Sequence, residues 1–517
     1  MALMDTLVSL VEGSVEGRRG RGIKRGTVTW KGIPFAKPPV GAGRWQAPEP
    51  VAPWPGVLAC HDYGSTPIQE KLVTARGAGR FQPRSEDCLT LNVFAPESVS
   101  STPRPVMVFN YGGAYILGGT STPIYDASYL ARDRDVIVVT VNYRVGPLGF
   151  LDLSDYSTDD RRFDTNVGLR DMVAGLEWVQ RNIAAFGGDP ERVTVFGESA
   201  GGSAVVTLLA TPAAEGLFTG AIAQSPVPDL TVTKENARIF TDEFVRLLVD
   251  PTRRSGPERT EPPLDPDEVA RIVDGASAQD LLRVGNKMLG FTRRARLSDP
   301  MPFAPTVDGD YLPQAPVQAA RDGATHRVPT IIGTNKDEGE MFARFWSILP
   351  DADQQLAGVY DPEVRTEIDR LYPGTRDRVR LSADAMFWIP TTLFAGYHSE
   401  HAPTYVYRYD YAPVMLNASG IGATHATELL AVFGIYRDPI GAGLAAAGSW
   451  RSSKRITSTM QSMWSWFARS GVPSPSWPAY VRGDRSVMIL DDPPRVERDP
   501  DGARRAAWER VHLDVAG

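Results

Sequence analysis

The stretch 193-VTVFGESAGGSA-204 decides how the rest of the chain is interpreted. It holds the pattern G-x-S-x-G, with Ser199 between Gly197 and Gly201. An apolar run enters the pattern, and 202-GSAVVTLLA-210 leaves it with helical periodicity. A tight strand-to-helix turn projects a serine hydroxyl into a cleft, and glycines on either side avoid a clash with the neighbouring strand and helix. This setting predicts a nucleophile at Ser199; the alternative is a plain helix start with Ser199 as its N-cap.

Other short apolar runs predict further strands of the same kind. They are rich in β-branched residues, end in glycine or polar residues, and lie at 105–110, 136–143, 193–197, 219–224, 328–334 and 404–410. Such near-continuous apolar runs are typical of a parallel sheet buried on both faces. Between two of them, residues 168–186 carry apolar side chains at three- and four-residue steps, which predicts an amphipathic crossover helix. Alternating strands and helices indicate an α/β fold with a large, mostly parallel central sheet flanked by helices.

A serine hydroxyl is a weak nucleophile unless a base takes its proton, and histidine is the side chain suited to that task near neutral pH. α/β-Hydrolases order their triad along the chain as Ser, then acid, then His. His425 lies in the glycine-containing segment 418–430, after the 404–410 strand, and fits this order. The remaining histidines precede that strand or lie in the polar C-terminal tail: His61, His326, His398, His401 and His512.

The triad acid is expected after the strand that precedes the histidine strand. That strand, 328–334, is followed by Asp337 and Glu338, with Glu340 two positions later. Position alone leaves Asp337 and Glu338 as alternatives, because both leave the same strand end.

An ester's tetrahedral intermediate carries a negative oxygen, which preorganised backbone N–H groups stabilise. One such donor should follow the nucleophile, which gives Ala200, and others should come from a glycine-rich loop after an early strand. The segment 106-VMVFNYGGAYILGG-119 supplies Gly112, Gly113 and Ala114. The alternative is a glycine hairpin without a catalytic role.

The chain length leaves the domain count open. Its 517 residues exceed the roughly 250–300 residues of a usual single core, so it is either two domains or one domain enlarged by insertions. Residues 249–268 are rich in Pro, Asp, Glu and Arg and nearly free of large apolar residues. We expect a mobile surface loop there, inside a mainly helical insertion at about 228–300.

Charge and hydropathy exclude several classes of function. A net charge of −7 and a pI of about 5.6 do not favour a nucleic-acid partner, and the basic run 18–25 predicts an exposed hairpin turn. No stretch of about 18 apolar residues predicts a membrane span, and the start of the chain is a poor signal peptide. Two cysteines, Cys60 and Cys88, do not form a disulfide scaffold. We therefore expect a cytoplasmic protein.

Beyond these single motifs, the chain resembles the type-B carboxylesterases, the family of bacterial para-nitrobenzyl esterases, animal carboxylesterases and cholinesterases. The resemblance runs almost end to end. It is carried by 31-KGIPFAKPPVGAGRWQAPEPVAPW-54, 85-SEDCLTLNVF-94, 141-VNYRVGPLGFL-151, 182-NIAAFGGDPERVTVFGESAGG-202, 333-GTNKDEG-339 and 464-WSWFARSGVPSPSWPAY-480.

The resemblance implies an α/β-hydrolase fold in a single enlarged domain over 1–517. It makes Ser199 the nucleophile, Glu338 the acid and His425 the base, so it decides between Asp337 and Glu338. It also implies that the oxyanion is held by the N–H groups of three residues, Gly113, Ala114 and Ala200. The chemistry needs no metal or organic cofactor, and the histidines lack the H-E-x-x-H spacing of a zinc site.

The resemblance also implies two structural ion pairs, Arg44 with Glu86 and Arg144 with Asp171. Three departures from the family pattern stand out. The family often pairs the cysteine of the SEDC motif with an upstream one, but 63-YGSTPIQ-69 has none, so both thiols are expected to be free. The usual Q-S-G-S reads Gln224-Ser225-Pro226-Val227, so the hydroxyl that often supports the acid is expected to be missing. Residues 70–84 contain no tryptophan, which disfavours choline esters.

The function expected from these observations is that of a serine carboxylesterase. Its substrates would be small uncharged esters of the p-nitrophenyl or p-nitrobenzyl type, with short to medium acyl chains, and the protein would be a monomer or homodimer without nucleic-acid or membrane partners. Candidate pocket residues, which could equally be ordinary core, are Phe303, Met341, Phe342, Phe345, Trp346 and Phe433. The alternatives are a non-catalytic cholinesterase-like interaction protein, or a lipase, thioesterase or carbamate hydrolase of the same fold.

Overall fold

The computed structural model describes residues 3–71, 75–77, 80–253, 262–291, 299, 301–345, 352–446 and 448–514. The chain forms two compact units. The first consists of Met1–Phe218 and Leu230–Ala315, and the second of Thr219–Asp229 and Pro316–Gly517. Part of the loop expected at 249–268, residues 254–261, lies outside the described residues. A single enlarged domain with a helical insertion stays a prediction.

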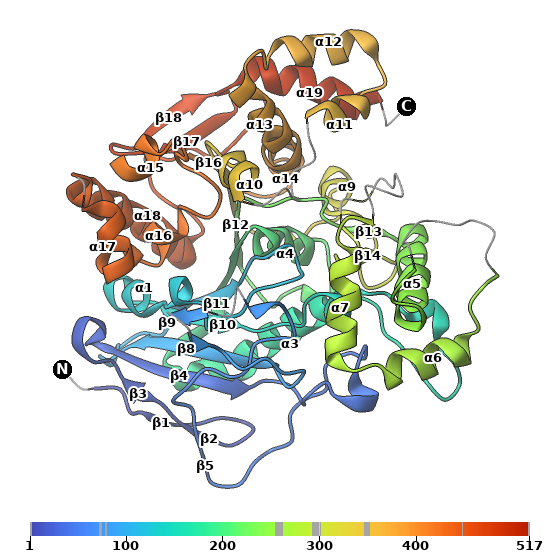
Figure 1. Ribbon diagram of the computed structural model, residues 1–517. Helices are drawn as coiled ribbons and strands as arrows, with labels where there is room; N and C mark the ends of the chain where they lie inside the picture. The colour runs from blue at the N-terminus through green and yellow to red at the C-terminus, as the bar shows by residue number, and fades with distance from the viewer. Residues whose placement is uncertain are drawn as a thin grey trace. The chain divides into compact units, whose positions relative to one another are not determined.

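The first unit is built on a mixed sheet with the strand order β11-β9-β10-β8-β4-β3 (Figure 1). β9 runs parallel to β10 and β11, whereas β8 and β3 run antiparallel to their neighbours. The strands span β3 (Arg18–Arg19), β4 (Thr27–Pro34), β8 (Thr90–Pro96), β9 (Arg104–Asn110), β10 (Ile137–Val141) and β11 (Gly188–Glu198). The predicted strands at 105–110, 136–143 and 193–197 are confirmed, and so is the hairpin turn in the basic run.

Burial explains why these segments are strands. Every residue of β9 and β10 is buried, and β-branched side chains fill most of β10. Such strands suit the middle of a sheet that is covered on both faces. The helix α3 (Val167–Asn182), continued by η6 (Ile183–Phe186), confirms the amphipathic helix predicted at 168–186, because its apolar face is buried.

The other α-helices described in the first unit are α1 (Ser128–Arg134), α2 (Pro147–Phe150), α4 (Ala200–Leu209), α5 (Lys234–Val249), α6 (Pro266–Gly275) and α7 (Ala278–Met288). The last three begin at capping side chains, Thr233, Asp265 and Ser277, each of which accepts a backbone N–H of the first turn. Small sheets are formed by β1 (Leu7–Ser9), β2 (Ser14–Glu16) and β5 (Val57–Ala59), by β6 (Ala75–Gly77) with β7 (Arg80–Phe81), and by β13 (Val232–Thr233) with β14 (Thr306–Val307).

Both ion pairs implied by the family resemblance are confirmed in the first unit. Arg44 binds both oxygens of Glu86, with N–O distances of 2.6 and 2.5 Å. Arg144 binds both oxygens of Asp171 at 2.8 and 2.7 Å, and its own backbone N–H donates to the same carboxylate at 2.9 Å. Asp171 is fully buried, so this bidentate pairing offsets the cost of placing its charge in the interior.

The second unit contains a further run of strands in the order β12-β15-β16-β17-β18. The first four are parallel, and β18 is antiparallel to β17. They span β12 (Gly220–Gln224), β15 (Thr330–Asn335), β16 (Thr404–Tyr409), β17 (Ser486–Leu490) and β18 (Arg495–Arg498). The strands predicted at 219–224, 328–334 and 404–410 are therefore confirmed, and parallel order brings the ends of β15 and β16 to one edge.

The helices of the second unit form two groups. One comprises α15 (Val414–Ala418), α16 (Leu429–Val432), α17 (Pro439–Ala445) and α18 (Trp450–Ser470). The other comprises α9 (Pro316–Arg321), α10 (Gly339–Phe345), α11 (Ala352–Ala357), α12 (Pro362–Arg370), α13 (Thr375–Ala383), the π-helical turn η8 (Asp384–Trp388), α14 (Ile389–His398) and α19 (Gly502–Asp514). Among the described residues, no helix is long and apolar enough to cross a membrane.

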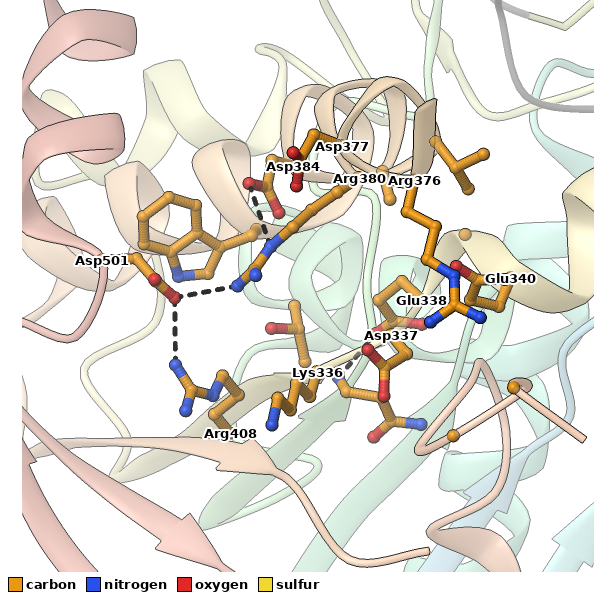
Figure 2. Close-up of a pocket in the computed structure, with 18 of the residues that line it drawn as sticks. Lys336, Asp337, Glu338, Glu340, Arg376, Asp377, Arg380, Asp384, Arg408 and Asp501 are labelled. Carbon is orange, nitrogen blue, oxygen red and sulfur yellow. Dashed lines mark hydrogen bonds and ion pairs between the residues drawn. The ribbon is translucent and has the colours of Figure 1, made fainter. Parts of the chain in front are cut away.

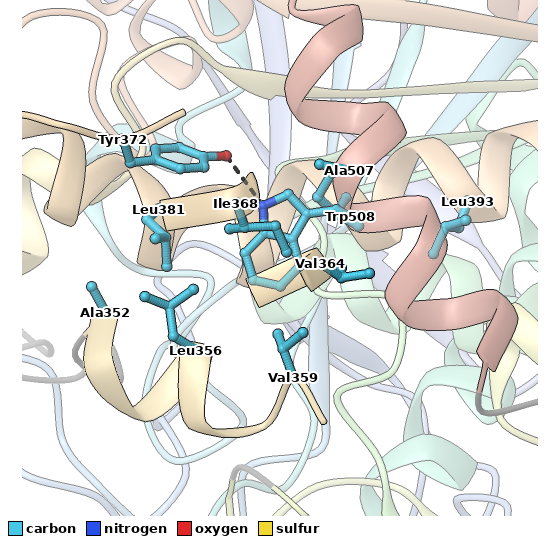
Figure 3. Close-up of a cluster of buried hydrophobic side chains, with 11 residues drawn as sticks. Ala352, Leu356, Val359, Val364, Ile368, Tyr372, Leu381, Leu393, Ala507 and Trp508 are labelled. Atoms are coloured by element: carbon cyan, nitrogen blue, oxygen red, sulfur yellow. Dashed lines mark hydrogen bonds between the residues drawn. The ribbon is translucent and has the colours of Figure 1, made fainter. Parts of the chain in front are cut away.

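The C-terminal helix α19 is held in the second group by an apolar cluster. Trp508 and Ala507 share this cluster with buried side chains of α11, α12, α13 and α14 (Figure 3). The Trp508 indole N–H donates to the Tyr372 hydroxyl at 3.2 Å, and that hydroxyl donates to Asp384 at 2.8 Å. The polar end of the tryptophan is thus satisfied inside the cluster, as a buried indole requires.

Candidate active site

Ser199 occupies the turn between β11 and α4, as the G-x-S-x-G pattern predicts. Its backbone has a φ of 58° and a ψ of −127°, a conformation that side-chain-bearing residues rarely adopt. Its side chain is half-buried, whereas residues 193–198 of β11 before it and α4 after it are buried. The Ser199 carbonyl accepts the Ser203 N–H at 2.8 Å and the Ser203 hydroxyl at 3.2 Å, which anchors the turn to the first helical residues.

The two glycines beside Ser199 are required by close backbone packing. A Cβ on Gly197 would lie 2.4 Å from the Gly201 carbonyl oxygen, and a Cβ on Gly201 would lie 2.1 Å from the Asn110 carbonyl oxygen. Both distances are far inside van der Waals contact. The strained turn is therefore clamped between the end of β9 and the start of α4, as expected of a nucleophile elbow.

The glycine loop that follows β9 lies directly beside Ser199. A Cβ on Gly112 would be 2.9 Å from the Ser199 Cβ and 2.6 Å from the Glu198 carbonyl oxygen. Gly113 and Ala114 both have positive φ, at 124° and 51°. Within the described part of the chain, no backbone acceptor takes the N–H of Gly113, Ala114 or Ala200, the three groups expected to bind an oxyanion.

Two sets of side-chain contacts hold the glycine loop in place. Tyr111 and Tyr143 stack with ring centroids 4.2 Å apart, and each hydroxyl donates to the carbonyl of the other residue, at 2.7 and 2.6 Å. The fully buried Gln69 binds both backbone groups of Gly118, accepting its N–H at 2.8 Å and donating to its carbonyl at 2.5 Å. Gln69 was not found from the sequence, because no local pattern signals a partner 49 positions away.

In the second unit, the predicted acid and base meet. His425 Nδ1 lies 2.6 Å from Glu338 Oε2, and both side chains are about 5% exposed or less. The other carboxylate oxygen, Glu338 Oε1, accepts the backbone N–H of Asn335 at 2.7 Å. The parallel strands β15 and β16 explain the meeting, since the loops that follow them leave the same sheet edge.

Asp337, the alternative acid, points to a different partner. Its Oδ2 accepts the Ala423 N–H at 3.0 Å, and its own N–H donates to the Ala423 carbonyl at 3.0 Å. Burial raises the pKa of the Asp337 carboxyl above its usual value. Asp337 therefore ties the loop that carries His425 to the end of β15, and it has no hydrogen bond to the imidazole.

A second buried glutamate, Glu428, lies in the turn that follows His425. Asn335 Nδ2 donates to Glu428 Oε2 at 2.5 Å and to the Thr424 carbonyl at 2.8 Å. Gln224 Nε2 donates to Glu428 Oε1 at 3.2 Å. Desolvation, followed by the charge of Glu338, raises the pKa of Glu428 to about 7. Neither Asn335 nor Glu428 was recognised from the sequence as part of the site.

Two phenylalanines flank the imidazole. The rings of Phe342, on α10, and Phe387, in η8, each lie 4.9 Å from the His425 ring. Phe342 was a candidate pocket residue, whereas Phe387 was not foreseen. π-Helical turns such as η8 occur often at functional sites, because the extra residue redirects side chains.

The other candidate pocket residues have mixed surroundings. Phe303 is buried in the first unit against Phe244, and Phe433 is buried in the second. Met341 is half-buried, and its N–H donates to the Thr424 hydroxyl at 3.0 Å. Phe345 is 64% exposed, and Trp346 lies outside the described residues.

A charged cavity of about 320 Å³ adjoins the end of β15 in the second unit. Figure 2 shows Asp501 between Arg380 and Arg408, with ion-pair distances of 3.2 and 3.0 Å. Asp337 and Glu338 also line this cavity. Its charged walls differ from the mostly apolar lining of a pocket for an uncharged ester, so we assign it no role in substrate binding. Over the described ranges, no cluster of three or more His, Cys, Asp or Glu side chains could hold a metal ion.

Comparison with known proteins places the whole chain in one family. The Carboxylesterase family profile matches residues 4–508. Para-nitrobenzyl esterase of Bacillus subtilis (strain 168) is 38% identical over 511 residues, covering 96% of this chain and 97% of that protein. Acylcarnitine hydrolase of Mus musculus is 32% identical, covering 94% of this chain and 87% of that one.

Solved structures agree with the sequence comparison. A PNB esterase structure superposes with a TM-score of 0.84 at 37% identity, covering 98% of this chain and 99% of that one. A thermophilic PNB esterase gives a TM-score of 0.83 at 35% identity, covering 98% of this chain and all of that one. These likenesses confirm the α/β-hydrolase fold and do not favour a non-catalytic interaction protein. The chain therefore belongs to the carboxylesterase family and is a hydrolase of carboxylic esters.

Proposed function

We propose that the enzyme works through a serine acyl-enzyme, with Ser199 as nucleophile, His425 as base and Glu338 as the acid that orients the base. The observation that carries this proposal is the 2.6 Å hydrogen bond between His425 Nδ1 and Glu338. When Nδ1–H donates to the carboxylate, the neutral imidazole carries its lone pair on Nε2, the nitrogen that must take the serine proton. The buried carboxylate then stabilises the imidazolium that forms.

The proposed reaction has two halves. Ser199 Oγ attacks the ester carbonyl carbon while His425 Nε2 takes the hydroxyl proton, and the tetrahedral oxyanion is held by the N–H groups of Gly113, Ala114 and Ala200. The C–O bond to the alcohol breaks, and His425 returns the proton to the leaving oxygen. Water then attacks the acyl-enzyme, giving its proton to His425, and the acid is released with restoration of the serine hydroxyl.

The oxyanion-binding role is supported by the position of the loop. Gly112 lies so close to Ser199 that a Cβ would not fit, and Gly113 and Ala114 follow it in positive-φ conformations that turn their backbone. Removing one such donor typically lowers the rate by about 10²–10³-fold. Gln69 and the Tyr111–Tyr143 pair hold the donors in place before substrate arrives, which is the preorganisation that this mode of catalysis needs.

The proposed substrates are small, uncharged esters with short to medium acyl chains, of the p-nitrophenyl and p-nitrobenzyl type. The para-nitrobenzyl esterase of B. subtilis, similar over nearly its whole length, supports this class. Phe303, Met341, Phe342, Phe345, Trp346 and Phe433 remain our candidates for the acyl and alcohol pockets. We also propose a monomer or homodimer that works in the cytoplasm, which the two free, buried thiols of Cys60 and Cys88 support.

The mechanism is tested by substituting the nucleophile. Ser199→Ala should abolish turnover of p-nitrophenyl butyrate and labelling by a fluorophosphonate probe, while circular dichroism and the thermal unfolding midpoint stay near those of the unaltered enzyme. Ser419→Ala is the matched control and should keep both properties, because it alters an exposed hydroxyl that donates to the Leu416 carbonyl and accepts the Ile421 N–H at 3.4 Å. Turnover by a folded Ser199→Ala enzyme would refute the assignment.

A further inference from the structure

Glu428 is a fully buried carboxyl group three residues after the proposed base. It is the N-cap of α16, and the turn from Thr424 to Glu428 is closed by the Thr427 N–H, which donates to the Thr424 carbonyl at 3.2 Å. Ala426, inside this turn, has a positive φ of 66°. The turn therefore contains a backbone conformation that is unfavourable for alanine. The side chains of His425 and Glu428 are both buried.

Asn335 connects Glu428 to the Glu338–His425 pair by three hydrogen bonds. Its backbone N–H holds Glu338 Oε1 at 2.7 Å, and its side-chain amide binds both Glu428 Oε2 at 2.5 Å and the carbonyl of Thr424 at 2.8 Å. Thr424 is the residue before His425. A single residue at the end of β15 thus sets the position of the acid and of the turn that carries the base, and Glu428 is the group that fixes its side chain.

The far side of Glu428 is fixed as well. Gln224, at the end of β12, donates to Glu428 Oε1 at 3.2 Å and accepts the Trp464 indole N–H at 3.2 Å. Both carboxylate oxygens of Glu428 therefore accept from amides, and neither amide carries a charge. Within the described residues, no arginine or lysine is paired with Glu428, so nothing of full positive charge compensates its ionised form except the imidazolium of His425.

The titratable groups that face Glu428 come from four segments. Glu338 follows β15, and His425 shares the turn with Glu428. Tyr409 ends β16, and Tyr436 lies in η9 (Ile435–Arg437); burial first, and then neighbouring groups including Glu428, raise the pKa of both phenols. The phenols stay neutral near pH 7, so the charge of Glu428 responds to Glu338 and His425.

We infer that Glu428 is a positioning residue for the proposed Glu338–His425 pair, and that its negative charge moves the lower pH boundary of activity upward. This inference rests on the proposed mechanism. Through Asn335, Glu428 fixes the position of the Glu338 carboxylate relative to the turn that carries His425. When ionised it favours the imidazolium, both as His425 titrates in the free enzyme and as it forms in the transition state. Desolvation, followed by the charge of Glu338, raises the pKa of Glu428 to about 7, so its charge changes near neutral pH.

The test compares kcat and kcat/KM for p-nitrophenyl butyrate, from about pH 5 to 9, in three variants and the unaltered enzyme. Glu428→Gln removes the charge at nearly constant shape. It should move the acid limb of kcat/KM to lower pH by roughly half a unit or more, because a negative charge near the imidazolium is lost. Its plateau kcat should fall roughly tenfold, with little change in KM.

Glu428→Asp keeps the charge but withdraws the carboxyl by one methylene from Asn335. Its acid limb should stay near that of the unaltered enzyme, while kcat falls by about three- to tenfold because the dyad is held less firmly. Glu340→Gln is the matched control: Glu340 is paired with Arg344 at 3.5 Å on α10, so its profile should not change. A purely structural role for Glu428 would lower the yield of folded enzyme without moving the acid limb.

An unchanged acid limb and unchanged kcat in folded Glu428→Gln would overturn the inference. If that variant does not fold, Glu428→Asp decides, since an unaltered kcat in it contradicts a positioning role. Failure of the underlying mechanism looks different. It would appear as turnover by Ser199→Ala or by His425→Ala, whatever the pH profile of the Glu428 variants.

Discussion

Replacing Glu338 by glutamine separates the two neighbouring acids most sharply. Glu338 accepts two hydrogen bonds, from His425 Nδ1 at 2.6 Å and from the Asn335 N–H at 2.7 Å. A glutamine side chain has one carbonyl oxygen and one NH₂ group, so it can accept from only one of these two donors and must point its NH₂ at the other. If the NH₂ faces His425, the imidazole must accept on Nδ1 and carry its proton on Nε2, where it cannot act as the base.

The magnitude follows from that tautomer argument. Loss of the orienting carboxylate in a serine hydrolase costs about 10⁴ in kcat when the wrong tautomer results. We expect a fall of roughly 10³–10⁴-fold for Glu338→Gln, which corresponds to about 4–5.5 kcal/mol of transition-state stabilisation. Asp337→Asn should behave differently, because the Asn carbonyl oxygen can still accept the Ala423 N–H that Asp337 binds at 3.0 Å. Its kcat should stay within about tenfold of the unaltered value.

The assay is the steady-state hydrolysis of p-nitrophenyl butyrate near pH 8, with circular dichroism and thermal unfolding to show that each variant is folded. KM should change little in Glu338→Gln, since the loss is confined to the transition state. The reverse order, with the large loss of kcat in Asp337→Asn, would mean that Asp337 and not Glu338 is the triad acid. Equal losses in both variants would mean that the two acids act only by holding the loop.

Three further predictions concern the loop and the fold. Gly112→Ala should lower kcat by about 10²-fold or more in folded enzyme, because the added methyl group would lie 2.6 Å from the Glu198 carbonyl oxygen and displace the loop proposed to bind the oxyanion. An unchanged kcat would contradict that role. Gln69→Leu should lower kcat by about tenfold without a matching rise in KM, since it releases both backbone groups of Gly118. Trp508→Ala should lower the free energy of unfolding, measured in urea, by about 3–5 kcal/mol, because removing the indole leaves a cavity in the cluster of Figure 3. A loss below about 1 kcal/mol would show that α19 is not anchored there.

The strands and the helix 168–186 could be predicted because burial leaves a local record. β9, β10 and β15 are buried along their whole length, so their sequences are continuous apolar runs. The apolar pattern does not predict where an irregular strand begins. β11 begins at Gly188, five residues before the apolar run at Val193, and its pairing with β9 shifts register between those residues. The polar segment there, Asp189 to Arg192, gives no strand pattern.

The groups that hold the site could not be predicted, for a different reason. Asn335 and Glu428 are 93 positions apart, and Gln69 and Gly118 are 49 apart. A hydrogen bond between distant residues leaves no periodicity, spacing or composition in either segment. His425 could be proposed as the base from the sequence only because the triad residues have a fixed order along the chain, which selects a histidine located after β16.

Three acids near the end of β15 show why side-chain type alone does not assign a role. Asp337, Glu338 and Glu428 carry the same functional group, but each faces a different kind of donor. Asp337 accepts a backbone N–H and ties a loop, Glu338 accepts an imidazole N–H and can orient a base, and Glu428 accepts two neutral amides and has no fixed counter-charge. Among these contacts, the Asn335 N–H donates to the second carboxylate oxygen of Glu338 at 2.7 Å. Asn335 holds the acid through its N–H and binds Glu428 through its side-chain amide, so the proposed dyad should be sensitive to changes at this buried carboxyl.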